Sequence, residues 1–228
     1  MRWMLTFIMT ALPALASAQE TPALATEKDR LSYAMGMDLG AQLKTRSVEI
    51  DPAVFGRGLA DALAGGKTLL TEEEAKAVIT ELQKAMMVKQ AAAAKAAAEK
   101  NKAEGEAFLA ANKAKEGVVA LPSGLQYKIL KVGDGRKPTE ADTVECQYRG
   151  TLVDGTEFDS SYRRGQPVTL KVKGGVIPGW AEALLLMPAG SKWQFVVPPQ
   201  LAYGERGAGR EIGPNATLVF ELEFLAVE

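Results

Sequence analysis

The stretch TVECQYRGTLVDGTEFDSS, residues 143–161, decides how the C-terminal half of the chain folds. In its first part Val144, Cys146 and Tyr148 alternate with polar side chains, a period of two that is typical of a strand with one buried face. The dipeptide Asp154-Gly155 that follows favours a tight hairpin turn. The stretch therefore predicts a long strand that ends in a hairpin.

The same alternation recurs on both sides of this stretch, at residues 125–129, 193–197 and 218–224. A short apolar segment, residues 180–186, has the composition of a helix and is bounded by prolines. We therefore predict that residues 117–228 form a small antiparallel sheet of about five or six strands wrapped on one short helix, a size that suits one domain.

The preceding part of the chain carries helix signals instead. Thr26 can cap a first helix, and the pair Asp51-Pro52 places a capping carboxylate before a proline at the first helical position. Gly65-Gly66 can end this second helix. We predict an all-helical region over residues 19–70, so the fold class of the whole chain is α+β.

A third helix begins at the capping box that Thr71 forms with Glu74, and no strong stop follows before Gly117. We predict one long connecting helix over residues 71–116. Its second half, residues 91–115, is mostly Ala, Lys and Glu, so a flexible low-complexity linker is the alternative. Gly, Ser and Pro are nearly absent there, which favours a solvent-exposed helical spacer.

The N-terminus has the pattern of an export signal. Arg2 precedes an almost wholly apolar run, and Ala16-Ser17-Ala18 offers the small residues of a cleavage site. A membrane anchor is the alternative, but the run is short for about 30 Å of hydrocarbon and contains Pro13. We predict that residues 1–18 are a cleaved signal peptide and that the protein is exported to the periplasm, with outer-membrane association or secretion left open.

Composition excludes much familiar chemistry. The 228 residues contain no His and one Cys, which excludes Ser-His-Asp and Cys-His catalysis, His-ligated metal sites and an intramolecular disulfide. Charges are balanced, with 27 basic and 28 acidic side chains and a net charge of −1, so nucleic acid is not expected as a partner. We expect a function that needs no metal ion and no cofactor.

The motifs of residues 117–228 resemble those of a known enzyme family in order and spacing. They are YRGTL from Tyr148, DGTEFDSS from Asp154, GVIPGW from Gly175, LAYG from Leu201 and NATLVF from Asn215. This set resembles FKBP-type peptidyl-prolyl cis–trans isomerases. The helical half, including SYAMG from Ser32, resembles the macrophage infectivity potentiator group, which implies a homodimer formed by residues 19–70 and an isomerase domain over 117–228.

The resemblance implies an apolar pocket that binds a proline-containing segment. Trp180 would form its floor beneath the proline ring, Asp159 would lie at the rim near the reacting carbonyl, and the Tyr203 hydroxyl would hold a substrate carbonyl. These are the implied catalytic residues. The other implied substrate contacts, with Ile177 acting through its backbone N–H, are Tyr148, Phe158, Val176, Ile177 and Phe220. Macrolides of the rapamycin type bind this pocket in the family and are expected inhibitors.

Aromatic residues that alternate along strands are usually core residues when they are judged by their pattern alone. The assignment of these residues to a pocket therefore rests on the order in which the motifs occur. The chain also departs from the family. Val168 stands where many members have a second pocket Phe, and the loop over residues 204–214 differs from that of the compact eukaryotic members. We hypothesise that Ile212 supplies the apolar substrate contact from this loop.

The primary functional prediction is an isomerase that accelerates X–Pro rotation in proline-containing exported or unfolded polypeptides. Rotation of the amide needs no nucleophile or metal, so the absence of His is no objection. The alternative is a dimeric periplasmic chaperone that holds unfolded clients, supported by Met35, Met37, Met86 and Met87 on apolar helix faces. A third possible function is that of a binding domain with an inactive site. The presence of Trp180, Asp159 and Tyr203 argues against it.

Overall fold

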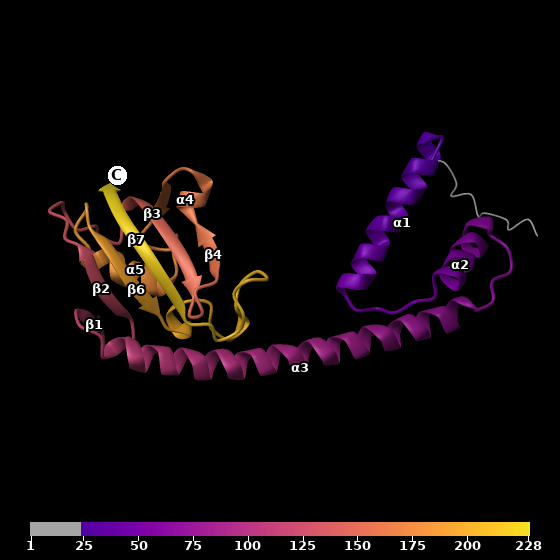
Figure 1. Ribbon diagram of the computed structural model, residues 1–228, viewed down its shortest axis with the longest axis horizontal. Coiled ribbons are helices and arrows are strands. Elements are labelled where there is room, and N and C mark those ends of the chain that lie inside the picture. Colours follow the sequence, from indigo (N-terminus) through magenta and orange to yellow (C-terminus); the bar gives the residue numbers. More distant parts are fainter. Residues whose placement is uncertain (1–23) are drawn as a thin grey trace, which may run out of the picture. The chain divides into compact units, whose positions relative to one another are not determined.

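The computed structural model describes residues 24–228, so the predicted signal peptide, residues 1–18, lies outside the described residues. The chain forms two compact units, one ending at Ala75 and the other running from Lys76 to Glu228. Figure 1 shows that the first unit is helical and that the second contains most of a long helix, a sheet and short helices.

The first unit holds the helices α1 (Glu27–Thr45) and α2 (Pro52–Ala64). Both begin where predicted, since the Thr26 hydroxyl and the Asp51 carboxylate accept hydrogen bonds from first-turn N–H groups at 3.1 and 2.8 Å. Helix α2 ends at Gly65, whose φ of 65° lies in the left-handed region that glycine adopts without strain. Within the described chain neither helix buries a residue.

Helix α3 (Glu72–Lys113) is continuous over 42 residues. Thr71 and Glu74 form the predicted capping box: the Thr71 hydroxyl accepts from the Glu74 N–H at 3.2 Å, and the Glu74 carboxylate accepts from the Thr71 N–H at 2.9 Å. The helix passes through Gly105 without a break. The long connecting helix is therefore confirmed, and it ends at Lys113 rather than at residue 116.

The second unit contains a seven-stranded antiparallel sheet. Its strands are β1 (Val118–Ala120), β2 (Gln126–Lys131), β3 (Thr143–Leu152), β4 (Glu157–Ser160), β5 (Val168–Lys171), β6 (Lys192–Val197) and β7 (Leu218–Val227). Its short helices are α4 (Ser161–Arg164), α5 (Pro178–Leu186) and the 3-10 turns η1 (Pro199–Leu201) and η2 (Gly204–Arg206). Strands β1 and β5, of three and four residues, are too short to produce an alternating pattern, which is why the sequence predicts fewer strands.

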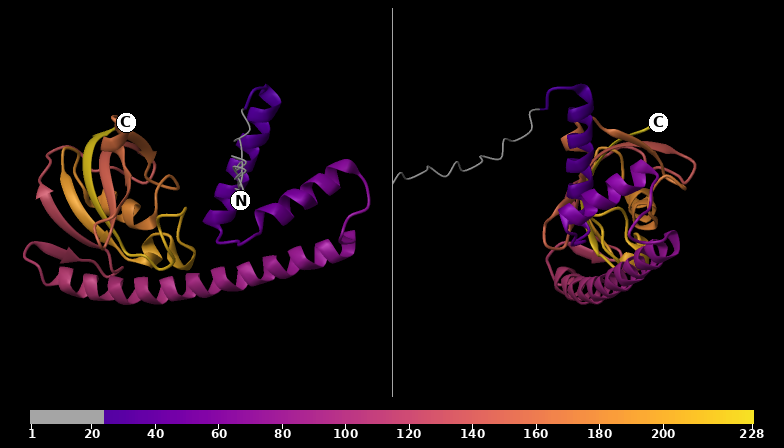
Figure 2. Two further views of the ribbon diagram at one scale, coloured as in Figure 1. Left: turned by 45° about the vertical axis from the view of Figure 1, so that its right-hand side comes forward. Right: turned by 90° about the vertical axis from the view of Figure 1, so that its right-hand side faces the viewer.

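Strands β3 and β7 form the centre of the sheet, whose order is β1-β2-β6-β7-β3-β4, with β5 paired to the first part of β3. On β7, Phe220 lies opposite Phe195 on one side and Gly150 on the other. The predicted turn at Gly155, with φ 88°, joins β3 to β4. The sheet is strongly twisted and curves around α5, as the two views in Figure 2 show.

The core of the second unit lies between the sheet and α5. The buried residues of α5 include Trp180, Ala183 and Leu184, and they belong to one cluster with inward-facing strand side chains. Phe195 and Phe224 are fully buried. Truncating such a Phe to Ala costs about 3–5 kcal/mol, so this cluster contributes much of the stability of the domain.

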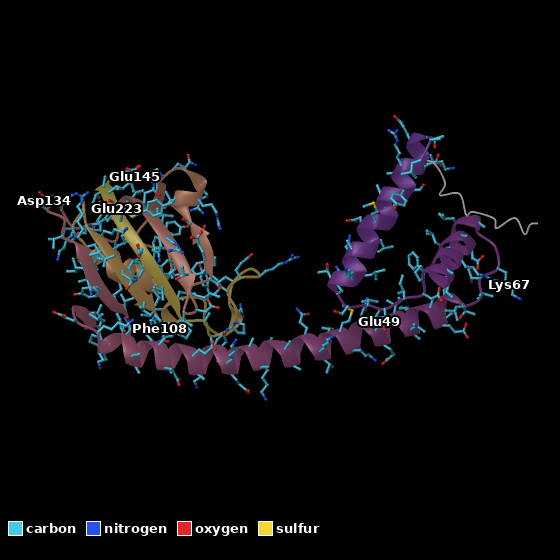
Figure 3. All side chains as sticks on the ribbon, in the orientation of Figure 1. Glu49, Lys67, Phe108, Asp134, Glu145 and Glu223 are labelled. Atoms are coloured by element: carbon cyan, nitrogen blue, oxygen red, sulfur yellow. The ribbon has the colours of Figure 1, made fainter. Side chains whose placement is uncertain are left out.

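The C-terminal part of α3 packs against this domain. Gly105 and Asn112 are buried, and the Asn112 amide donates a hydrogen bond to the Gln126 side chain of β2 at 3.0 Å. The Gln126 amide in turn donates to a backbone carbonyl of α3 at 2.9 Å. Phe108, labelled in Figure 3, is half-buried on the helix. The helical state predicted for residues 91–115 is thus confirmed as far as Lys113, but the prediction that this segment is a solvent-exposed spacer is wrong for its last turns.

The predicted α+β class is confirmed, with N-terminal helices, a long helix and an antiparallel sheet wrapped on a short helix. Across residues 24–228, none of the helices combines the length and the apolar character needed to span a bilayer.

Candidate active site

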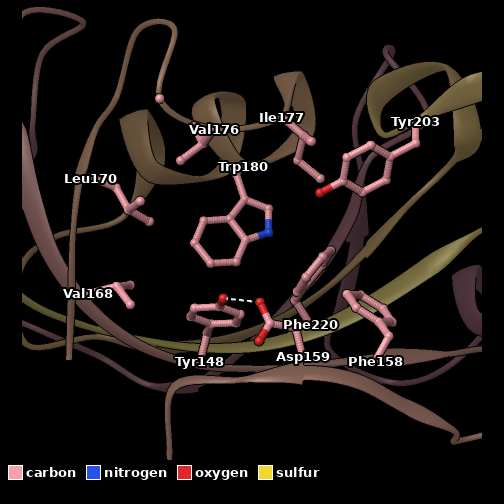
Figure 4. Close-up of a pocket in the computed structure, with 11 residues that line it drawn as sticks. Tyr148, Phe158, Asp159, Val168, Leu170, Val176, Ile177, Trp180, Tyr203 and Phe220 are labelled. Carbon is pink, nitrogen blue, oxygen red and sulfur yellow. Dashed lines mark hydrogen bonds between the residues drawn. The ribbon is translucent and has the colours of Figure 1, made fainter. Parts of the chain in front are cut away.

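A cavity of about 160 Å³ opens between the sheet, α5 and the loop that follows β6 (Figure 4). It has room for a few water molecules, each of about 30 Å³ in the liquid, or for one small apolar ring. The residues that line it are mostly apolar or aromatic: Tyr148, Phe158, Asp159, Val168, Leu170, Gly175, Val176, Ile177, Trp180, Tyr203 and Phe220.

Trp180, in the first turn of α5, forms the floor of the cavity. It is only 5% exposed and meets the rings of Tyr148 and Phe220 edge to face, with centroid distances of 4.9 and 5.2 Å. The preceding Gly179 sets its depth, because a Cβ there would lie 2.5 Å from the side chain of Val197 in β6. Glycine at this position therefore allows the start of α5 to approach the sheet.

One side wall is a pair of rings from neighbouring strands. Phe158 of β4 and Phe220 of β7 meet edge to face at 5.6 Å, across the backbone of β3. Between them lies Gly150, at which a Cβ would come within 2.6 Å of Phe158 and 2.8 Å of Phe220. The glycine of the YRGTL motif is thus required by the packing of the pocket wall.

The rim carries a charged hydrogen-bond network. The Tyr148 hydroxyl donates to one oxygen of Asp159, and the Arg164 guanidinium donates to the other. Arg164 also donates to the Tyr148 hydroxyl oxygen at 2.8 Å, and its charge lies 5.4 Å from the Tyr148 ring centroid. Both oxygens of the carboxylate are therefore engaged, and its position is set from two sides.

This network fixes the protonation states of its members. Partial burial alone would raise the pKa of the Asp159 carboxyl, but the hydrogen bonds from Tyr148 and Arg164 outweigh it and lower the pKa below its ordinary 3.8. Burial, with the bond to Asp159, raises the pKa of the Tyr148 hydroxyl above 10.0. Near neutral pH Asp159 is a carboxylate and Tyr148 a neutral phenol.

Two further polar groups face the cavity. Tyr203, in the loop after β6, points its hydroxyl toward Ile177 and the cavity centre in Figure 4. Ile177 precedes α5, and among the backbone hydrogen bonds of residues 24–228 outside regular elements none uses its N–H. The cavity thus combines aromatic walls with a hydroxyl and a backbone donor, which is the usual composition of a small-ligand site.

Known proteins of similar sequence share both units. The chain is 49% identical over 218 residues to the "Outer membrane protein MIP" of Legionella longbeachae, covering 96% of this chain and 93% of the relative. It is 44% identical over 227 residues to the "Peptidyl-prolyl cis-trans isomerase Mip" of Coxiella burnetii, covering 100% and 98%. The crystal structure of FkpA from Escherichia coli superposes with a TM-score of 0.67 at 33% identity, over 90% of this chain and 98% of that one.

Family models match nearly all of the described chain. Residues 134–225 match the "FKBP-type peptidyl-prolyl cis-trans isomerase" family, and residues 28–129 match the "Domain amino terminal to FKBP-type peptidyl-prolyl isomerase". The chain belongs to the FKBP-type peptidyl-prolyl cis–trans isomerases. The predicted enzyme class is thereby confirmed, and as a member of this family the protein binds proline-containing polypeptides.

The structure of this FKBP-type isomerase brings nearly all the predicted site residues together. The cavity lining includes the predicted catalytic set of Trp180, Asp159 and Tyr203, together with Tyr148, Phe158, Val176, Ile177 and Phe220. Their catalytic and binding roles remain predictions.

Ile212 is placed differently from the prediction. It is only 8% exposed and belongs to the core cluster, and it is not among the residues that line the cavity. Its N–H and carbonyl pair with Ala208, which turns the side chain of this FKBP-type loop inward. A direct apolar contact from Ile212 to a substrate is not supported by this placement.

Sequence reasoning did not assign Leu170, Gly175 and Arg164 to the site of this isomerase. Leu170 and Gly175 line the cavity, and Arg164 completes the rim network. Leu170 follows the already noted Val168 at a spacing of two on β5, but two positions are too few to establish a period. Arg164 carried no signal, because its role depends on α4 folding back over β3. Within residues 24–228 no cluster of His, Cys, Asp and Glu side chains could hold a metal ion.

Proposed function

We propose that this isomerase binds a proline ring on Trp180 and accelerates rotation of the preceding amide bond by favouring its twisted form. In this proposal the Tyr203 hydroxyl and the Ile177 N–H hold substrate carbonyls on either side of the proline. The observation that carries the proposal is the cavity itself, in which aromatic rings surround Trp180 and the Asp159 carboxylate lies at the rim.

The energetic basis is differential binding. The planar X–Pro amide is stabilised by resonance and is polar, and the barrier to its rotation is about 18–20 kcal/mol. Twisting removes the resonance and reduces the charge separation, so an apolar, water-poor cavity stabilises the twisted amide relative to the planar one. Only such selective stabilisation of the transition state raises the rate.

Asp159 acts in this proposal as a fixed negative charge near the reacting carbonyl and not as a base. Its oxygens already accept hydrogen bonds from Tyr148 and Arg164, and its lowered pKa keeps it ionised at neutral pH. A carboxylate held in this way needs no reorganisation when the amide twists, which is the condition for electrostatic stabilisation.

The test is NMR exchange on a short Leu-Pro peptide with residues 19–228. The protein should speed cis–trans exchange, and the Tyr203→Ala, Asp159→Ala double variant should lose most of this activity. A matched control replaces the same residue types outside the cavity, as in Tyr162→Ala, Asp134→Ala. If the cavity and control variants are equally active, the assigned roles are wrong. If even the unmodified protein is inactive, the proposed mechanism is wrong.

We propose the periplasm as the place of action and exported polypeptides as the clients. Two observations support this: the predicted signal peptide at residues 1–18, and a relative named "Outer membrane protein MIP". Expression of the full chain with a C-terminal tag, followed by cell fractionation and N-terminal sequencing, tests it. A periplasmic product that begins near Gln19 is expected, whereas uncleaved protein in the cytoplasm would contradict it.

We also propose that residues 19–70 form a homodimer. Helices α1 and α2 bury no residue in the described chain, yet Leu31, Leu59 and Leu63 are more than half exposed. Gly36 and Gly40 on α1 have open space around them, so another helix could approach closely. Light scattering of residues 19–228 should give twice the mass of one chain. The double variant Leu59→Arg, Leu63→Arg should give the mass of a monomer. A monomeric unmodified protein would refute the dimer.

A chaperone activity, in which the dimer also holds unfolded clients, is the second candidate. Met35 and Met37, both on α1, are 65% and 63% exposed, and flexible thioethers suit promiscuous apolar binding. A chain that starts at Lys76 should keep its turnover on a short peptide and lose its ability to suppress aggregation of an unfolded protein. Equal loss of both activities would contradict this division between the two units.

A further inference from the structure

Helix α3 contacts the loop that carries Tyr203. The Asn101 side-chain amide donates a hydrogen bond to the Pro214 carbonyl at 2.8 Å, between residues 113 positions apart in the chain. Gly213 makes room for this contact, because a Cβ there would lie 2.8 Å from the Asn101 nitrogen. One turn further along the helix, a Cβ at Gly105 would lie 2.3 Å from the Thr217 hydroxyl oxygen. The helix is therefore fitted closely to the C-terminal end of this loop.

That end of the loop is bonded to the residue next to Tyr203. The Asn215 N–H donates a hydrogen bond to the Gly204 carbonyl at 2.8 Å, which closes the loop at its base. Asn215 has φ 56°, a left-handed conformation that few non-glycine residues adopt. One hydrogen bond therefore links the residue after Pro214 to the residue after Tyr203.

The rest of the loop is a compact hairpin. Ala208 and Ile212 exchange backbone hydrogen bonds of 2.8 and 3.1 Å, and the Ile212 side chain is buried in the core. Tyr203 itself is 41% exposed, so packing around its ring restrains it only in part. The backbone that precedes the hairpin is therefore one of the restraints on the position of its hydroxyl in the cavity.

We propose that Asn101 is a positioning residue of the isomerase site, acting through Pro214, Asn215 and Gly204 on Tyr203. Helix α3 is then part of the scaffold of the site as well as a connection between the two units. The inference rests on the role proposed above for Tyr203. A hydroxyl that must meet a substrate carbonyl at hydrogen-bond distance loses its effect when it is misplaced by about 1 Å.

Asn112 offers a matched control on the same helix. It is also an asparagine whose amide donates to the sheet domain, but its partner is Gln126 on β2 and not the Tyr203 loop. If α3 contributes only stability, Asn101→Ala and Asn112→Ala will lower the melting temperature and leave the site unchanged. If Asn101 positions Tyr203, only Asn101→Ala will change the loop and the catalysed rate.

The first measurement is amide hydrogen exchange in residues 19–228. In Asn101→Ala the Asn215 N–H should exchange about tenfold faster, because the loop base opens more often, and Asn112→Ala should leave this N–H unchanged. Gly213→Ala, which pushes the Asn101 amide away by a clash, should reproduce the Asn101→Ala result. Unchanged exchange at Asn215 in both loop variants would overturn the proposal.

The second measurement is a double-mutant cycle on peptide isomerisation. Asn101→Ala should lower kcat/KM about three- to tenfold, and adding it to Tyr203→Ala should cause no further loss, because the group it positions is already gone. Full additivity, or an Asn101→Ala protein as active as the unmodified one, overturns this inference alone. A Tyr203→Ala protein of full activity overturns the role of Tyr203 and the inference with it.

Discussion

The Tyr148 hydroxyl donates a hydrogen bond to the Asp159 carboxylate at the mouth of the pocket, and Arg164 bonds to both side chains. The bond joins a wall residue from β3 to a rim residue from β4. Hydrogen bonds to ionised groups are roughly twice as strong as neutral ones, and both oxygens of this carboxylate accept one. In the proposed mechanism it holds a negative charge in place beside the site where the amide twists.

We expect Tyr148→Phe to remove this restraint while keeping the aromatic wall. Loss of one charge-assisted hydrogen bond should let the pKa of Asp159 rise and its carboxylate move, lowering kcat/KM about tenfold. The measurement is NMR exchange on a Leu-Pro peptide.

The control for Tyr148→Phe is Tyr162→Phe, which removes the hydroxyl of an exposed tyrosine bonded to Glu223 outside the pocket. It should be as active as the unmodified protein. Equal activity of the two variants would show that the hydroxyl of Tyr148 does not contribute to catalysis.

The catalysed rate should not depend on pH between about 5 and 9. The folded pKa of Asp159 is lowered below 3.8, so the contribution of the network is fully present above about pH 4 and is lost as pH falls through the lowered pKa. The pKa of Tyr148 is raised above 10.0, so its hydroxyl keeps its proton throughout this range. Rate measurements on a peptide with blocked termini test this. An inflection near pH 6–8 would mean that another ionising group takes part.

Gly105→Ala should destabilise the second unit, although Ala normally stabilises a helix by about 1 kcal/mol relative to Gly. The added Cβ would meet the Thr217 hydroxyl oxygen at 2.3 Å, and overpacking of this kind costs about 1–3 kcal/mol. Urea unfolding followed by the fluorescence of the buried Trp180 and Trp193 measures the effect. In a Thr217→Ala background the same substitution should cost markedly less. An identical cost in both backgrounds would contradict the close approach.

Val168→Phe should strengthen binding of a rapamycin-type macrolide about five- to tenfold. Val168 lines the cavity from β5, and a larger ring there would bury more apolar surface of the ligand. Calorimetric titration measures the affinity, and Val132→Phe, at a site that is 77% exposed, serves as the control. Weaker binding in Val168→Phe would mean that the cavity has no room for the ring at this wall.

Much of the sheet domain follows from local pattern. The period of two predicts β3, β6 and β7 and the inward direction of Phe195, Phe220 and Phe224, because these strands are long and have one buried face. The helix starts follow from short-range capping chemistry. Strands of three or four residues carry too few positions for a period to be detected, so β1 and β5 are not predictable in this way.

Contacts between distant segments could not be predicted from the sequence. Gly105 is expected only to weaken a helix, whereas the structure requires it for the approach to Thr217. Asn112 and Gln126 are ordinary polar residues in sequence, and only the fold joins them through buried hydrogen bonds. The sequence leads us to expect a substrate contact from Ile212, but in the structure this residue pairs with Ala208 and its side chain is buried in the core.

The contacts at Asn101, Gly105 and Asn112 lie on one face of α3, so the isomerase domain is held at a fixed angle around the helix axis. A helix turns by about 100° per residue and rises about 1.5 Å. Inserting one residue into the alanine-rich stretch over 91–94 would therefore turn the mouth of the pocket by about 100° relative to the turns of α3 directly before the insertion. Inserting seven residues would return it to within about 20° of its starting direction, some 10 Å further along. The number of residues in α3 thus sets the direction in which the active site faces around the helix axis. It also sets the position of the active site along that axis.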